Sequence, residues 1–134
     1  MEKDSKTKFT EETALKPRTS KVSSDHLVNA WYETFGLPIL ITNCSNNYGP
    51  FQFPEKLIPV LILNALSEIN LPIYGDGSNM REWLFVNDHA EALILVLERG
   101  TVGRCYNIGS NYECSNIELA NLVCKILNDL KPRK

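Results

Sequence analysis

Apolar residues recur along the chain with two alternating kinds of spacing, and this pattern predicts an α/β fold. From Thr19 to Phe35 they stand three or four residues apart, as on one face of a helix, and Gly36 is a natural C-terminal stop. The next segment, Pro38 to Asn43, is a short apolar run that is typical of a strand buried on both faces. Strands that alternate with helices in this way indicate a parallel sheet.

Three further helices are predicted from apolar spacing and from capping residues. The first covers residues 54–66 and includes Pro59 within its first turns, and the second runs from a cap at Asn87 or Asp88 to Glu98. The third runs from Ser115 to about Leu130 and opens with a capping box between Ser115 and Glu118. In the second of these helices four residues are expected to point inward: Ala92, Leu93, Val96 and Leu97.

Three further strands are predicted at residues 71–74, 81–86 and 105–108. The first is closed by the turn Gly75-Asp76-Gly77, and the second carries Trp83 and Phe85 in alternation. The order of elements along the chain therefore predicts an α/β fold throughout.

Composition and charge exclude several classes of function. The 134 residues, 43% hydrophobic and 22% charged, are ordinary for a soluble globular protein of one domain. The net charge is −2 with no dominant block of either sign, which argues against a nucleic-acid or membrane-surface partner. No apolar run approaches the roughly 20 residues of a membrane span, and no signal-peptide pattern opens the chain, so we expect a cytoplasmic protein.

The cysteines do not form a metal-binding or disulfide pattern. Cys44, Cys105, Cys114 and Cys124 are isolated from one another, with no Cys-x-x-Cys pair and no cluster of histidines. We therefore expect free thiols and no structural zinc, as is usual in a reducing compartment.

Two polar features suggest a binding site. Asn46 and Asn47 offer amide donors and acceptors at the end of the predicted strand 38–43, where open α/β sheets place their ligands, although Asn also fills ordinary turns. Arg81 carries a guanidinium that can hold a pyrophosphate through paired hydrogen bonds, and the alternative is a surface arginine that lies beside Trp83. Tyr74, beside a turn, could stack on a base.

Four consecutive segments resemble the extended short-chain dehydrogenase/reductases that act on sugar nucleotides, specifically the dTDP-glucose 4,6-dehydratases. They are Ser20–His26, TNCSNNYGPFQFPEKLIP from Thr42, LPIYGDGSNMREWLFV from Leu71 with Asp88-His89 after it, and GRCYNIG from Gly103. The resemblance covers roughly residues 9 to 130, and its asparagine-tyrosine-glycine-proline string is long and specific. It implies the C-terminal part of a Rossmann-like parallel sheet together with a small sugar-nucleotide-binding region.

The resemblance implies roles for individual residues. Lys21 matches the lysine of the family's Tyr-x-x-x-Lys pair, and Lys21 and Asn46 match positions that contact NAD, the family's cofactor. The helix Thr19 to Phe35 matches a dimer-forming helix, and a dTDP-sugar is the implied ligand. For Leu57 and Ile73 a plain core role is the alternative. The implied substrate-binding residues are Asn46, Asn47, Lys56, Leu57, Pro72, Ile73, Tyr74, Arg81 and Asn116.

Several parts of that family's catalytic machinery have no match in this sequence. Pro17 stands four residues before Lys21, where a tyrosine base is expected, and residues 11–20 look shortened. The acidic pair that eliminates water has no match, and no glycine-rich turn follows a strand. We therefore expect a chain that is inactive alone and does not bind NAD alone.

The resemblance also predicts how the chain is organised. It implies a single truncated domain with a tail over 1–12, the end of the dinucleotide-binding fold over 13–50 and mainly substrate-binding region over 51–134. A strand that is apolar on both faces needs neighbours, so we expect self-association, a partner chain or marginal stability. Two alternatives to an inactive descendant remain, namely a dTDP-sugar-binding or dimerisation module and one half of a split enzyme.

Overall fold

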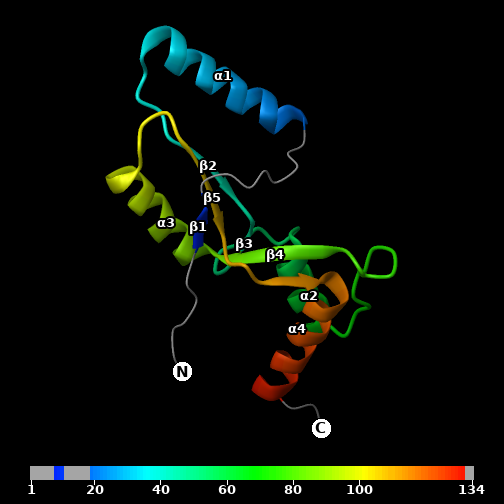
Figure 1. Ribbon diagram of the computed structural model, residues 1–134. Coiled ribbons are helices and arrows are strands. Elements are labelled where there is room, and N and C mark those ends of the chain that lie inside the picture. The colour runs from blue at the N-terminus through cyan, green and yellow to red at the C-terminus, as the bar shows by residue number, and fades with distance from the viewer. Residues whose placement is uncertain (1–7, 11–18, 132–134) are drawn as a thin grey trace. The chain divides into compact units, whose positions relative to one another are not determined.

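The computed structural model describes residues 8–10 and 19–131 (Figure 1). The contacts divide the chain into two compact units, and each unit is built from two separate stretches of sequence. Unit 1 comprises residues 1–45 and 87–111, and unit 2 comprises residues 46–86 and 112–134. Each unit contains a three-stranded sheet, and helices accompany both sheets, so the predicted α/β class is confirmed.

The sheet of unit 1 has the strand order β1-β5-β2. The central strand β5 (Cys105–Gly109) pairs in parallel with β2 (Ile41–Cys44) and antiparallel with β1 (Lys8–Thr10). Strand β2 begins at Ile41 rather than at the predicted Pro38, because the pairing with β5 starts there. Residues 8–10, which the sequence placed in a tail, form β1 through a long-range pairing that no local pattern indicates.

Two helices belong mainly to unit 1. Helix α1 (Thr19–Phe35) has the predicted bounds and ends as predicted, since Gly36 adopts a φ of 66° and its N–H donates to the Tyr32 carbonyl at 2.9 Å. Helix α3 (Val86–Arg99) follows strand β4 directly, so the prediction of a cap at Asn87 or Asp88 is wrong.

The buried face of α3 is narrower than predicted. Ala92 and Val96 are buried as expected, but Leu97 is 74% exposed, so its inward prediction is wrong. The reason is geometric, because consecutive helical residues point roughly 100° apart and Leu97 follows Val96 directly.

The sheet of unit 2 has the strand order β3-β4-β6. Strand β4 (Met80–Phe85) is central, pairing in parallel with β3 (Asn46–Tyr48) and antiparallel with β6 (Glu113–Ser115). The sequence did not predict β3 or β6, which have only three residues each. Pairing across the sheet, rather than local propensity, creates such short strands.

The predicted strand at 71–74 is absent, and that prediction is wrong. This segment is an extended connection, and Leu71 and Ile73 pack against the core of unit 2 instead of joining a sheet. The turn predicted after it is present, since Gly75 and Gly77 have φ values of 61° and 76° and the Gly77 N–H donates to the Tyr74 carbonyl.

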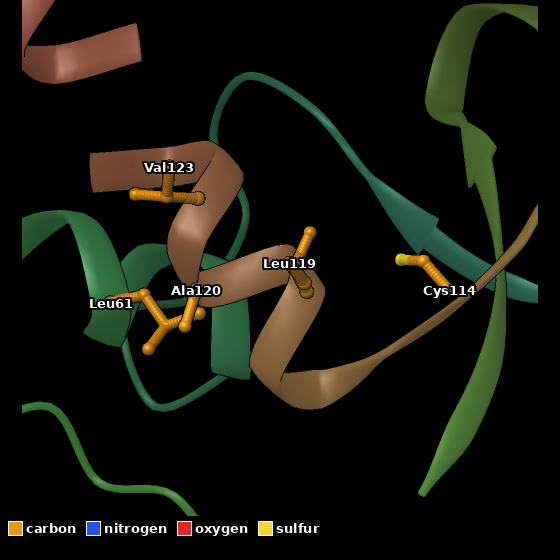
Figure 2. Packing of buried hydrophobic residues seen from close by; sticks show 5 residues of the cluster. All are labelled: Leu61, Cys114, Leu119, Ala120 and Val123. Atoms are coloured by element: carbon orange, nitrogen blue, oxygen red, sulfur yellow. The ribbon is translucent and has the colours of Figure 1, made fainter. Parts of the chain in front are cut away.

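Helices α2 (Leu57–Leu66) and α4 (Asn116–Leu130) form the core of unit 2. Helix α2 begins at Leu57 rather than at Pro54, with Pro59 in its first turn as predicted. The predicted capping box of α4 is confirmed, with Ser115 Oγ accepting from the Glu118 N–H at 3.3 Å. Figure 2 shows the buried cluster between α2, α4 and β6: Leu61, Cys114, Leu119, Ala120 and Val123.

Candidate functional site

Every residue that the sequence singled out for substrate binding lies in unit 2, whereas Lys21 lies in unit 1. Lys21 is the third residue of α1 and its side chain is exposed. Pro17, at the position where the tyrosine base is expected, lies outside the described residues. The predicted substrate-binding residues therefore all belong to unit 2, and among the described residues Lys21 has no catalytic partner.

Strands β3 and β4 place Asn46 and Arg81 on the same face of the sheet. Asn46 is in register with Trp83, and Arg81 precedes Trp83 by two residues. Because side chains alternate along a strand, these three point to one side, whereas Asn47 points to the other. From the spacing of residues and strands, the Cα atoms of Asn46 and Arg81 lie roughly 8 Å apart. One ligand can therefore reach both side chains.

The same sheet face carries the core of unit 2. Cys114 is in register with Arg81 on the neighbouring strand, and partners in an antiparallel pair point to the same side. Cys114 belongs to the buried cluster, and Trp83 packs against it. Arg81, which is exposed, therefore lies on the same sheet face as this buried apolar cluster.

The turn after residue 74 is bound to the start of α4. The Asn116 N–H donates to the Asn79 carbonyl at 3.1 Å, and the Ile117 N–H donates to the Gly77 carbonyl at 3.1 Å. A Cβ added at Gly77 would lie 2.8 Å from Ile73 Cγ2 and 2.9 Å from Ile117 Cβ. Only glycine allows this approach, which places Gly77 between Ile73 and Ile117, the neighbour of Asn116.

The remaining predicted residues differ in their exposure. Lys56 is the cap residue of α2 with an exposed side chain, and Tyr74 and Pro72 are also exposed. Leu57 and Ile73 pack against the buried cluster, which agrees with the core role that the sequence left open for them. Of these five residues, Lys56, Pro72 and Tyr74 therefore have side chains that are available to a ligand.

Hydrogen bonds fix the charge of two acidic groups in this unit. The Ser115 N–H and Oγ both donate to Glu118 Oε2 at 2.8 Å and lower the pKa of Glu118. Ser78 donates to Asp76 from Oγ at 2.6 Å and from its N–H at 3.0 Å, which lowers the pKa of Asp76. Both carboxylates stay ionised at neutral pH.

Cys114 is unsuited to act as a nucleophile. Burial raises the pKa of its thiol, and the nearby Glu118 carboxylate raises the pKa further. All four cysteines are free. Within the described ranges no group of three or more His, Cys, Asp or Glu residues could hold a metal ion.

The backbone N–H groups at the start of α4 are already hydrogen-bonded within the protein. Its first N–H groups bind the Asn79 and Gly77 carbonyls and Ser115 Oγ, so they cannot also cradle a phosphate. A phosphate at this end of the sheet would therefore have to be held by side chains. Asn116 Oδ1 is buried and accepts no hydrogen bond from any described residue.

The described residues do not fit the pyrophosphate of a dinucleotide such as NAD. Strand β4 passes into α3 without a glycine, and the connection from β3 to α2 contains only Gly49. Gly49 has no room to face a phosphate, since a Cβ added there would lie 2.5 Å from Val86 Cγ1. A glycine-rich turn between strand and helix is what such a cofactor requires.

Sequence reasoning missed the part played by Gln52. Its Nε2 donates to the Asn47 carbonyl at 2.8 Å and ties the turn after β3 back to that strand. The Gly49-Pro50 pair indicated a turn, but no local signal identified the residue that closes it.

None of the helices in ranges 19–131 has the length and apolar character needed to cross a bilayer.

Comparison with known proteins identifies close relatives. The chain is 55% identical over 130 residues to dTDP-glucose 4,6-dehydratase of Neisseria meningitidis serogroup B, covering 94% of this chain and 37% of the relative. It is 53% identical over 130 residues to dTDP-glucose 4,6-dehydratase 1 of Escherichia coli K12, covering 94% and 36%. The chain thus spans less than half the length of these relatives.

Solved structures and a family model agree with these relatives. The dTDP-glucose 4,6-dehydratase of Bacillus anthracis, solved in complex with NAD, matches with a TM-score of 0.82 and 50% identity, over 89% of this chain and 40% of that one. The model of the NAD dependent epimerase/dehydratase family matches residues 3–109. The predicted resemblance is confirmed, and the chain belongs to the NAD dependent epimerase/dehydratase family.

Proposed function

We propose that this chain binds a dTDP-linked sugar through unit 2 and does not carry out a dehydration by itself. The observation that carries the proposal is the placement of Asn46 and Arg81 on one face of β3 and β4. Asn116 begins α4 directly after β6, the other neighbour of β4. The relatives named above are dTDP-glucose 4,6-dehydratases, which supports a dTDP-sugar as the ligand.

Each part of a nucleotide sugar has a suitable partner in this proposal. The Arg81 guanidinium binds the diphosphate through two parallel hydrogen bonds, and Lys56 adds a second positive charge. Asn46 and Asn116 contribute amide groups for hydroxyl or phosphate oxygens, and the exposed Tyr74 ring stacks on the base. Arg81 contributes most, because a charge-assisted contact is worth about 1.5–3 kcal/mol and a neutral one about 1 kcal/mol.

The expectation of inactivity depends on the residues that would do chemistry. The parent reaction converts dTDP-glucose to dTDP-4-dehydro-6-deoxyglucose and water, with NAD taking and returning a hydride. Lys21 matches one member of the family's catalytic pair, but Pro17 occupies the position of the base. Without a tyrosine base at that position, we expect the chain to keep only the binding step.

A titration with dTDP tests the binding proposal. Parent, Arg81→Ala and Arg81→Lys are compared by calorimetry at a fixed low salt concentration, after circular dichroism shows that all are folded. Arg81→Ala should weaken binding by roughly 10- to 150-fold. Arg81→Lys should show most of this weakening, because an ammonium group cannot form the two parallel hydrogen bonds of a guanidinium. Arg104→Ala, an exposed arginine of unit 1, is the matched control and should bind like the parent. Equal binding by the parent and Arg81→Ala would contradict the proposal.

A second function, pairing of two copies through α1, is favoured by the surface of that helix. Leu27, Trp31 and Phe35 are exposed and follow one another at four-residue steps, and the rings of Trp31 and Phe35 lie 4.9 Å apart. The face of α1 that unit 1 half-buries is a different one and includes Asp25 and Tyr32. An apolar stripe of this kind indicates a partner helix.

The mass in solution tests this pairing. Light scattering after size-exclusion chromatography should give a dimer for the parent and a monomer for Trp31→Glu, which places a charge in the stripe. Glu33→Gln, an exposed position on the same helix, is the control and should remain dimeric. A monomeric parent would exclude homodimer formation and leave a complementing chain as the partner of α1.

A further inference from the structure

The turn that follows β3 is fixed at both of its ends. Gly49 lies against Val86 so closely that an added Cβ would be 2.5 Å from Val86 Cγ1, and the Gln52 N–H donates to the Gly49 carbonyl at 3.4 Å. The Gln52 side chain also donates to the Asn47 carbonyl at 2.8 Å. The conformation at the tip of this turn is therefore set by the protein and does not follow from the tip residue itself.

Phe51 occupies the tip in a conformation that its residue type does not favour. Its φ is 63°, in the left-handed region that glycine enters freely and that other residues enter at a cost. Two other non-glycine residues share this region, but Glu68 follows the end of a helix and Asn111 is a type that tolerates it. Phe51 has neither reason.

The Phe51 ring also contributes nothing to the packing of unit 2. Its side chain is fully exposed, at 106% of the reference area, although Tyr48 nearby packs its ring 5.6 Å from that of Phe85. An exposed aromatic ring on a strained, well-anchored backbone has no folding explanation, and such positions gather at ligand sites.

The position of Phe51 in the chain links it to the candidate site. The turn joins Asn46 and Asn47 on β3 to Lys56 and Leu57 at the start of α2, and all of these lie in unit 2. The turn also follows the carboxyl end of β3, which pairs in parallel with β4. Ligands in α/β proteins bind at this end of parallel strands.

The chemistry of the ring selects one part of the ligand. The face of a benzene ring carries partial negative charge, so it does not suit a diphosphate, whereas it suits the C–H groups of a pyranose ring. From these observations we infer that the Phe51 ring packs against the hexose of the bound nucleotide sugar and favours sugar-bearing over sugar-free nucleotides. This inference rests on the proposed function and adds a specificity-determining residue to it.

The test compares dTDP-glucose with dTDP, which lacks the hexose. Calorimetry gives the dissociation constants of both ligands for the parent, Phe51→Ala, Phe51→Tyr and Phe51→Gly. The parent should bind dTDP-glucose about three- to tenfold more tightly than dTDP, and Phe51→Ala and Phe51→Gly should lose this preference with dTDP affinity unchanged. Phe51→Tyr should keep the preference. Phe53→Ala, an exposed aromatic two residues on, is the control and should also keep it.

Stability measurements separate ligand contact from a structural role. Phe51→Gly relieves the backbone strain, so its unfolding temperature should equal or exceed that of the parent while the preference for dTDP-glucose is lost. An unchanged preference in Phe51→Ala would overturn the inference, and so would an equal loss of affinity for both ligands or a change in oligomeric state. If the parent binds dTDP without any preference for dTDP-glucose, the inference fails while the proposed function stands. If the parent binds neither ligand, both fail.

Discussion

Replacing Leu61 by alanine should destabilise unit 2 more than any exposed substitution on the same helix. Leu61 is 0% exposed and lies in the cluster with Ala120 and Val123 of α4. Substitutions of buried leucine by alanine cost about 2.7–5 kcal/mol, and the value depends on how far the surroundings can collapse into the cavity.

The surroundings of Leu61 cannot collapse freely, so the upper part of that range applies. Helix α4 follows β6 without a break, its capping box closes on Ser115, and the Asn116 N–H is bound to the Asn79 carbonyl. These attachments hold the start of α4 in place, so α4 cannot move to fill the cavity that Leu61→Ala creates. We expect a loss of about 4 kcal/mol out of a total stability of about 5–15 kcal/mol.

Urea unfolding can follow this loss in unit 2 alone, because the two tryptophans lie in different units. Trp83 packs against the cluster in unit 2 and Trp31 lies on α1 in unit 1, so a Trp31→Phe background leaves only the Trp83 signal. Leu66→Ala, at a position 56% exposed on the same helix, is the control and should cost less than about 1 kcal/mol. If Leu61→Ala costs no more than Leu66→Ala, the α2–α4 core is not packed as described.

Three further outcomes are expected. Hydrogen bonds hold the pKa of Glu118 below its ordinary value. The ionised Glu118 therefore contributes fully to stability above about pH 4.5, and this contribution is lost as the pH falls. Below pH 4.5 the unfolding temperature of Glu118→Gln should therefore decline less steeply than that of the parent. Gly49→Ala should lower the unfolding temperature more than Gly75→Ala, because both have positive φ but only Gly49 would place a Cβ against Val86. A titration with NAD should give a dissociation constant weaker than about 100 μM, and tighter binding would contradict the absence of a pyrophosphate cradle in the described residues.

Local signals predicted the elements that are stabilised locally. The capping box from Ser115 to Glu118 specifies the start of α4 within four residues, and Gly36 specifies the end of α1 in the same way. For this reason both helices have the predicted bounds or nearly so. The Asn46 and Arg81 pair could be suspected from residue type, but the pairing of β3 with β4 was needed to place them on one face.

Long-range pairing decided the elements that the sequence missed. Strands β1, β3 and β6 have three residues each, and a segment of three residues carries no periodicity to detect. The segment 71–74 has the composition of a strand, but no neighbouring strand is available to it and its apolar residues pack on helices. The strain at Phe51 was equally invisible, because it arises from contacts of Gly49 and Gln52.

The division of unit 2 into residues 46–86 and 112–134 has a consequence for synthesis on the ribosome. Helix α2 emerges before α4 and carries the apolar face around Leu61 that α4 helps to cover in the finished unit. At about 5–20 residues per second, the roughly 50 residues between the end of α2 and the start of α4 take about 3–10 seconds to make. During that interval the nascent chain displays a hydrophobic surface that a chaperone can bind and that another nascent chain can capture.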